Sequence, residues 1–143
     1  MVAGSTKVIN GVTLNATATI YSLVPEEDLT QATNSWMNVA PGESFSIFTY
    51  GTSASGTVDY DVYVDISPLD SSIAYNSSDT TKYVGFKLTS SVIAADATMY
   101  HYTSADLTKT NMDYPFCKMR IRCVGSASNP ADSIIHLWVV KAN

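Results

Sequence analysis

The sequence predicts an all-β protein: a single antiparallel β-sandwich, jelly-roll-like or immunoglobulin-like, with about eight strands and minimal helix. Three observations lead to this prediction. Stretches in which apolar and polar residues alternate recur along the chain, separated by clusters of Gly, Pro, Asn, Asp and Ser. The polar positions are mostly Ser, Thr and Asn rather than the helix-forming Glu and Lys. No helical periodicity persists.

The chain of 143 residues is long enough for one domain with its own core. We divide it into an N-terminal arm, residues 1–11, and a single sandwich domain, residues 12–143. The arm is polar, and Gly4 and Gly11 lie near its ends. We expect it to add to another subunit's sheet or to lie on a larger shell, with Val8 as one of its contacts.

Each expected strand follows a turn signal. The strands span residues 12–23, 35–39, 44–50, 57–66, 82–88, 97–102, 116–124 and 133–140. Two short segments favour a helical turn or two instead: residues 25–32, where a proline precedes three acids, and residues 90–98. The inward side chains of the strands should form the core, which we expect to contain Val58, Tyr60, Val62, Val64, Met119, Ile121, Ile135, Leu137 and Val139.

Three carboxylates lie on one face of the strand TVDYDVYVDI, namely Asp59, Asp61 and Asp65. Neighbouring side chains on one face of a strand are about 7 Å apart, so Asp59 and Asp61 are too far apart to bind one calcium ion unaided. Acid–base chemistry would require burial to shift a pKa. A solvated or salt-bridged face is therefore the favoured interpretation.

The strand at residues 116–124 is the cationic counterpart, because Lys118, Arg120 and Arg122 point outward from it. If the two strands are neighbours, ion pairs cross between them, each contributing a few tenths to about 1 kcal/mol. If they are not, one of the two charged faces meets a partner of opposite sign. The inward face carries Cys117 and Cys123, about 20 Å apart, which predicts free thiols and folding in a reducing cytoplasm.

Several functional classes have no support in the sequence. His101 and His136 lie in expected strands beside aromatic residues, and no zinc-binding spacing or Gly-x-Ser-x-Gly motif occurs. No glycine-rich loop leads into a helix, so we expect no cofactor, no metal and no catalytic residue. The net charge of −5 argues against nucleic-acid binding. No apolar stretch of membrane-spanning length and no signal peptide is present, which predicts no membrane association.

The C-terminal part of the chain resembles structural proteins of tailed bacteriophages. The resemblance rests on the acidic strand and Ser turn at residues 55–67, on Tyr114 with Arg120 and Arg122, on Gly125, and on the aliphatic residues 134–140. A Trp that often follows the Ser turn in such proteins is absent here. The resemblance implies a virion component of small β-sandwich type, such as a head-decoration (cement) protein.

From this resemblance we expect a non-enzymatic protein, made in the host cytoplasm, that forms homo-oligomers and binds the outer surface of the major capsid protein shell. The alternatives are a tail, neck or fibre protein, or a carbohydrate-binding module that uses Tyr100, Tyr102 and Trp138 in a row. The long loops at residues 67–81 and 103–115 should contact the partner. Their large apolar residues, the candidate contacts besides Val8, are Leu69, Ile73, Tyr75, Leu107, Met112 and Tyr114.

Overall fold

The computed structural model describes residues 4–23, 36–38, 44–69, 73–74, 76–88, 91–94, 98–103 and 118–142. These residues form ten β-strands and no helix, which confirms the predicted all-β class. In this part of the chain there is accordingly no helix long and apolar enough to cross a membrane. The helical candidate at residues 25–32 lies outside the described residues.

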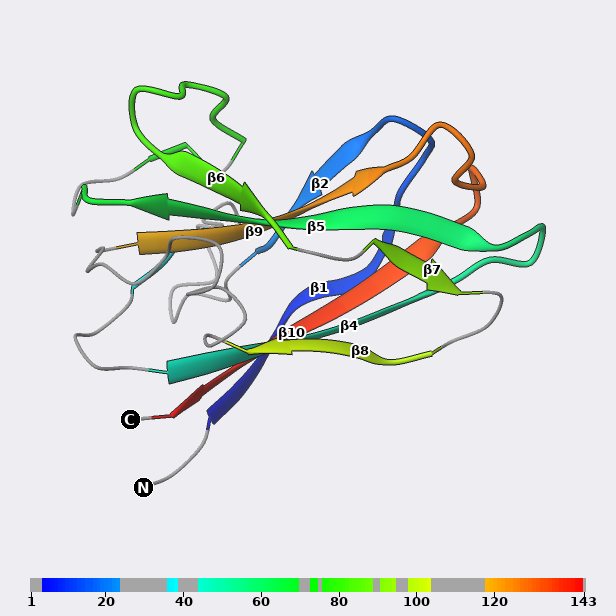
Figure 1. The fold of residues 1–143 in the computed structure, drawn as a ribbon, viewed down its shortest axis with the longest axis horizontal. Coiled ribbons are helices and arrows are strands. Elements are labelled where there is room, and N and C mark those ends of the chain that lie inside the picture. Colours follow the sequence, from blue (N-terminus) through cyan, green and yellow to red (C-terminus); the bar gives the residue numbers. More distant parts are fainter. Residues whose placement is uncertain are drawn as a thin grey trace.

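Four strands form the first sheet, in the order β1-β10-β4-β8. Their bounds are Gly4–Thr13 for β1, Ile134–Ala142 for β10, Ser44–Thr52 for β4 and Tyr100–Thr103 for β8. All neighbours are antiparallel. Because the first strand pairs with the last, the two ends of the chain lie at the same end of the molecule (Figure 1).

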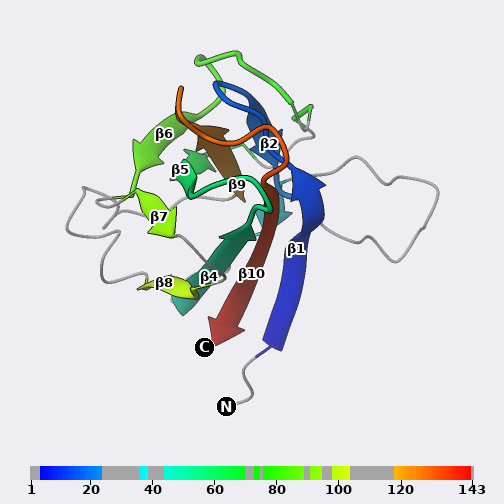
Figure 2. The ribbon, with the colours of Figure 1, turned by 90° about the vertical axis from the view of Figure 1, so that its right-hand side faces the viewer.

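The second sheet has six strands with β9 (Lys118–Gly125) and β5 (Val58–Ser67) at its centre. Two short strands, β2 (Thr19–Tyr21) and β3 (Met37–Asn38), pair with β9, and β6 (Val84–Lys87) and β7 (Val92–Ala94) pair with β5. Figure 2 shows the two sheets as two layers. The chain is therefore a β-sandwich, as predicted.

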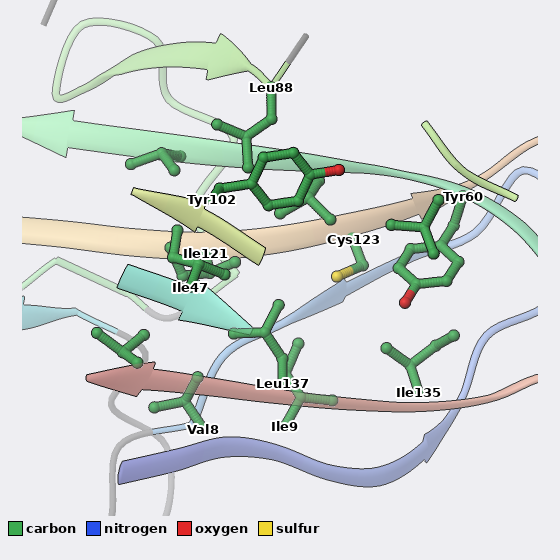
Figure 3. Packing of buried hydrophobic residues seen from close by; sticks show 14 of the residues in the cluster. Val8, Ile9, Ile47, Tyr60, Leu88, Tyr102, Ile121, Cys123, Ile135 and Leu137 are labelled. Atoms are coloured by element: carbon green, nitrogen blue, oxygen red, sulfur yellow. The ribbon is translucent and has the colours of Figure 1, made fainter. Parts of the chain in front are cut away.

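The core lies between the layers (Figure 3). All of the predicted core residues, from Val58 to Val139, are buried there. The phenol of Tyr60 also lies in the core, with its hydroxyl 2.8 Å from Thr49 Oγ1. The Thr49 hydroxyl donates its single proton to the carbonyl oxygen of His136 at 2.9 Å, so Tyr60 is the donor to Thr49. A polar chain thus joins both sheets inside the core.

The predicted N-terminal arm is wrong. Residues 4–13 form β1, an edge strand of the sandwich, and Val8 and Ile9 are 2% and 1% exposed. Their burial follows from a β-bulge between Lys7 and Ile9, which turns two consecutive side chains toward the core. The bulge breaks the strict alternation that marks a strand in a sequence. A second irregularity, at Gly11 with φ of 63°, follows two residues later.

The expected strand at residues 12–23 is also corrected, because the chain turns in the middle of it. β1 ends at Thr13 and β2 begins at Thr19, with Thr17 in the left-handed region at φ of 58°. The turn packs onto Gly125, where an added Cβ would lie 2.4 Å from the carbonyl oxygen of Asn15. A side chain at Gly125 would therefore displace the turn.

The second helical candidate, residues 90–98, is wrong in its described part. Val92–Ala94 form strand β7, which pairs with β5. Val92 is fully buried and Ile93 is 56% exposed, which is the alternation of a strand. Three residues are too few for this period-two signal to stand out in the sequence.

Candidate functional site

A buried ionic cluster lies on the outer face of the six-stranded sheet. The antiparallel register of β5 and β9 places Asp65 opposite Arg120 and Tyr63 opposite Arg122. Arg120 donates from Nε and Nη2 to Asp65 Oδ2, at 2.9 and 2.7 Å. Arg122 donates from Nε to both carboxylate oxygens, at 2.9 and 2.8 Å. One carboxylate therefore holds two guanidinium groups.

Aromatic rings from three separate segments cover the guanidinium of Arg120. Its central carbon lies 4.6 Å from the ring centroids of Tyr21 and Trp36 and 4.7 Å from that of Tyr83. Its Nη1 donates to the carbonyl oxygen of Ser77 at 3.0 Å. Arg120 therefore fastens parts of residues 76–83 to the sheet, with ring faces and a carbonyl as its partners.

This cluster decides between two alternatives that the sequence left open, and it corrects one expectation. The acidic and basic strands are neighbours, and an ion pair crosses between them. Of the solvated or salt-bridged face that the sequence favoured, the salt bridge forms, but solvation is wrong for Asp65 and Arg120, whose side chains are fully buried. The reason is the aromatic cover, which comes from residues distant in the sequence. Gly85 in β6 leaves room for Asp65 and Arg122, because a Cβ added at this position would lie 2.7 Å from both Arg122 Nη2 and Asp65 Oδ1.

The other charged candidates lie nearer the surface. Asp61 pairs with Lys87 at 3.2 Å and accepts a hydrogen bond from Ser91. Asp59 accepts a hydrogen bond from Ser128 at 3.1 Å. Lys118 begins β9, opposite Ser67. Within the described ranges, no group of three or more His, Cys, Asp or Glu side chains could hold a metal ion.

The candidate partner contacts divide into three groups. Val8 and Ile73 are buried, at 2% and 7% exposed, so both belong to the protein's own interior and are wrong as free contacts. Leu69 is 36% exposed, lies two residues after the end of β5 and stays a candidate. The remaining candidates lie outside the described residues: Tyr75, Leu107, Met112 and Tyr114.

An aromatic surface that was not predicted from the sequence lies on the four-stranded sheet. Its outward side chains include three stacked rings: Tyr50 and His136 at 4.8 Å between centroids, Tyr50 and Trp138 at 5.7 Å, and His136 and Trp138 at 6.2 Å. Phe48 stacks with His101 at 5.9 Å. We call these five residues, Phe48, Tyr50, His101, His136 and Trp138, the aromatic face.

The row of Tyr100, Tyr102 and Trp138 expected for a carbohydrate-binding module does not form. Tyr102 is 7% exposed and packs in the core, and Tyr100 packs against the core from the same side of β8. Alternation along β8 turns His101 outward instead. The signal for the actual surface was strand β10, which carries mostly apolar and aromatic side chains on both faces and therefore suggests a second covered side.

Two basic side chains shape the electrostatics of the aromatic face. The ammonium of Lys7 lies over the indole of Trp138, 4.6 Å from the ring centroid. Desolvation lowers the pKa of His136 below its usual 6.5, and the positive charge of Lys7 lowers it further. At neutral pH the His136 ring is therefore uncharged.

Comparison with known proteins gives a likeness of fold. No family model matches the chain, and no curated protein matches it. A chain in the solved structure of infectious bursal disease virus, Gx strain, superposes with a TM-score of 0.53 at 7% sequence identity. The superposition covers 97% of the present chain and 31% of the viral chain. The protein is thus similar in fold to part of a longer chain from a virus that is not a tailed phage.

Proposed function

We propose that this chain is a non-enzymatic structural protein of a virus particle, and that it decorates the capsid by binding the outer surface of the shell of major capsid protein. The observation that carries this proposal is the likeness to a chain of a virus structure over nearly the whole of the present chain. The resemblance of residues 55–67 and 134–140 to tailed-phage structural proteins supports the same class. Both likenesses support the proposal of a virion component, and they differ in the kind of virus.

The geometry of the six-stranded sheet supports a binding role for the segment after β5. A protein that strengthens a shell needs a rigid contact surface, because ordering a loose loop on binding costs free energy. Arg120 holds Ser77 and Tyr83 against the sheet, and Trp36 Nε1 donates to the carbonyl oxygen of Ala74 at 3.2 Å. Leu69, exposed beside this anchored segment, is the contact that we assign to the shell.

Co-sedimentation with empty capsids of the virus whose genome encodes the chain tests this proposal. Wild-type protein should saturate the capsids at a fixed ratio. Leu69→Ser should weaken binding roughly ten-fold, because the contact loses about 1–2 kcal/mol of apolar burial. Leu23→Ser is the matched control. Leu23 is a similarly exposed leucine, at 42%, and it lies on the segment after β2, distant from Leu69 in the sequence.

Each result decides between the proposed roles. A wild-type protein that does not bind capsids would overturn the decoration role, and binding to tails or fibres would support that alternative. Binding to a glycan array would support a carbohydrate-binding module. Equal losses for Leu69→Ser and Leu23→Ser would show that the shell contact lies elsewhere.

A further inference from the structure

The outer face of the four-stranded sheet is aromatic at its centre, and none of the described residues places a carboxylate on it. Strands β1, β4, β8 and β10 contain no Asp or Glu, although the chain carries a net charge of −5. The described carboxylates lie elsewhere, on β5 and in the turns, and they are Asp59, Asp61, Asp65, Asp79 and Asp132. We propose that the aromatic face is the contact surface between two copies of this chain, which pack face to face as a symmetric dimer.

The charge distribution favours a second copy of the chain as the partner that binds the aromatic face. Two acidic molecules repel each other, and the repulsion is smallest where the facing surfaces carry no carboxylate. The aromatic face meets this condition, with a neutral His136 near its centre and the ammonium of Lys7 held over Trp138. A two-fold dimer uses the same patch on both subunits, so the condition is met on both sides at once.

The composition of the face suits a protein interface. Aromatic side chains are enriched at the centres of such interfaces, and carboxylates are depleted there. Phe48, Tyr50, His136 and Trp138 are all partly exposed, so their rings have surface left to bury. On the six-stranded sheet, the comparable rings of Trp36 and Tyr83 instead cover the protein's own Arg120.

The ring geometry disfavours a glycan as the occupant. A sugar ring stacks on an aromatic face that is open to solvent. Here the planes of Tyr50, His136 and Trp138 lie within 20–24° of one another at centroid separations that place them in offset stacks. Each ring therefore covers part of its neighbour, and the ammonium of Lys7 occupies a further part of Trp138.

The size of the sheet sets the expected strength of the dimer. Strands β1, β4, β8 and β10 have ten, nine, four and nine residues. At about 3.3 Å per residue and about 4.8 Å between strands they make a face of roughly 500 Å². Two such faces bury about 1,000 Å² in total, near the lower limit of specific interfaces. We therefore expect a weak dimer with a Kd of roughly 10–100 μM rather than an obligate one.

Sedimentation equilibrium of the purified chain tests the proposal without any capsid, so its outcome is independent of the decoration role. Wild-type protein should pass from monomer to dimer over a concentration series. Ser46→Glu places a carboxylate on the outward side of β4, opposite Val140, and should raise the Kd at least about ten-fold because the charge must be desolvated. Ala127→Glu adds the same charge on the exposed turn between β9 and β10 and should leave the Kd unchanged.

Salt provides a second readout that does not depend on a variant. Raising NaCl from about 50 to about 500 mM should strengthen the dimer, because it screens the repulsion between copies and leaves an apolar contact intact. Far-UV circular dichroism and a thermal melt would show that Ser46→Glu still folds.

Several results would overturn the dimer. One is a wild-type protein that stays monomeric up to about 1 mM, and another is an equal effect of Ser46→Glu and Ala127→Glu. A monomeric wild type that loses capsid or glycan binding through Ser46→Glu would assign the face to that other partner.

Discussion

At the scale of single residues, Asp65 balances two arginines with one carboxylate, so the buried cluster on the six-stranded sheet carries excess positive charge. Burying a guanidinium is unfavourable unless its charge and its donors are satisfied. Arg120 meets this requirement with Asp65, with the Ser77 carbonyl and with the negative ring faces of Tyr21, Trp36 and Tyr83. Among the described residues, the carboxylate of Asp65 is the only anion in this cluster.

Asp65→Asn should therefore destabilise the protein strongly. The substitution leaves two guanidinium groups without an anion, one of them fully buried, and should cost about 3–5 kcal/mol in the free energy of unfolding. Urea denaturation measures this cost. Asp61→Asn is the control, because Asp61 pairs with a half-exposed Lys87 at 3.2 Å and should cost less than about 1 kcal/mol. Equal costs for the two variants would contradict the argument.

The Tyr60–Thr49 pair in the core predicts an asymmetry between two variants. Tyr60→Phe removes a donor, and the Thr49 hydroxyl keeps its bond to the His136 carbonyl, so the cost should be about 1 kcal/mol. Thr49→Val leaves the Tyr60 hydroxyl and that carbonyl without this partner inside the core, and should cost about 2–3 kcal/mol. Urea denaturation of both variants checks the order, and a larger cost for Tyr60→Phe would refute the assigned donor direction.

At the scale of elements, β1 is part of the sandwich, so deleting residues 1–10 should destabilise or unfold the protein. The deletion removes Val8 and Ile9, two fully buried side chains whose burial contributes about 1.5–3 kcal/mol each, together with most of the ladder to β10. A thermal melt followed by circular dichroism measures the loss. Deleting residues 1–3 leaves Gly4–Thr13 whole and serves as the control. A truncated protein with an unchanged melt would restore the idea of a detachable arm.

The sequence was informative where strands alternate without interruption and misleading where they do not. β5 and β9 were predicted within two residues at each end, because apolar and polar residues alternate along both. β10 was predicted as closely, because its apolar run is bounded by a turn signal. β1 was missed because a bulge puts Val8 and Ile9 side by side on the core face. The turn around Thr17 was missed because Ala and Thr continue the alternation through it.

The candidate sites show the same division. The charged strands could be recognised because their pattern is local, and the register of β5 with β9 then follows from the fold. The burial of Arg120 could not be predicted, since its cover comes from Tyr21, Trp36 and Tyr83, in three distant segments. The aromatic face was missed for a similar reason: it combines side chains of β4, β8 and β10, which are adjacent only in the folded sheet.

At the scale of the whole molecule, both outer faces of the sandwich carry aromatic side chains, and they differ in how these are used. On the six-stranded sheet, the protein's own segments close over the rings and the ion pair. On the four-stranded sheet, the rings of the aromatic face remain partly exposed. One outer face is thus covered by the protein's own segments, whereas the other keeps aromatic surface that is accessible to a partner.

The pH dependence of stability should have a window just below neutral pH, set by His136, and an acid window, to which Asp132 and Asp79 contribute because their pKa values are lowered. His136 has a lowered pKa in the folded protein, so below pH 6.5 the unfolded chain takes up the proton first, and stability falls with pH until the folded pKa is passed. The positive charge of Lys7 from β1 acts on this ring, and Tyr50 from β4 stacks against it.

Asp132 accepts hydrogen bonds from the hydroxyls of Ser53 and Ser55, both at 2.6 Å, which lower its pKa below 3.8. Its stabilising contribution is present above pH 3.8 and disappears as pH falls through the folded pKa. Urea denaturation at about pH 7.5, 5.5 and 3 separates the two windows. His136→Gln should reduce the loss of stability between about pH 7.5 and 5.5. Asp132→Asn should leave that loss unchanged and should reduce the loss of stability between about pH 5.5 and 3. If His136→Gln loses as much stability as the wild type between about pH 7.5 and 5.5, the aromatic face does not hold that ring neutral.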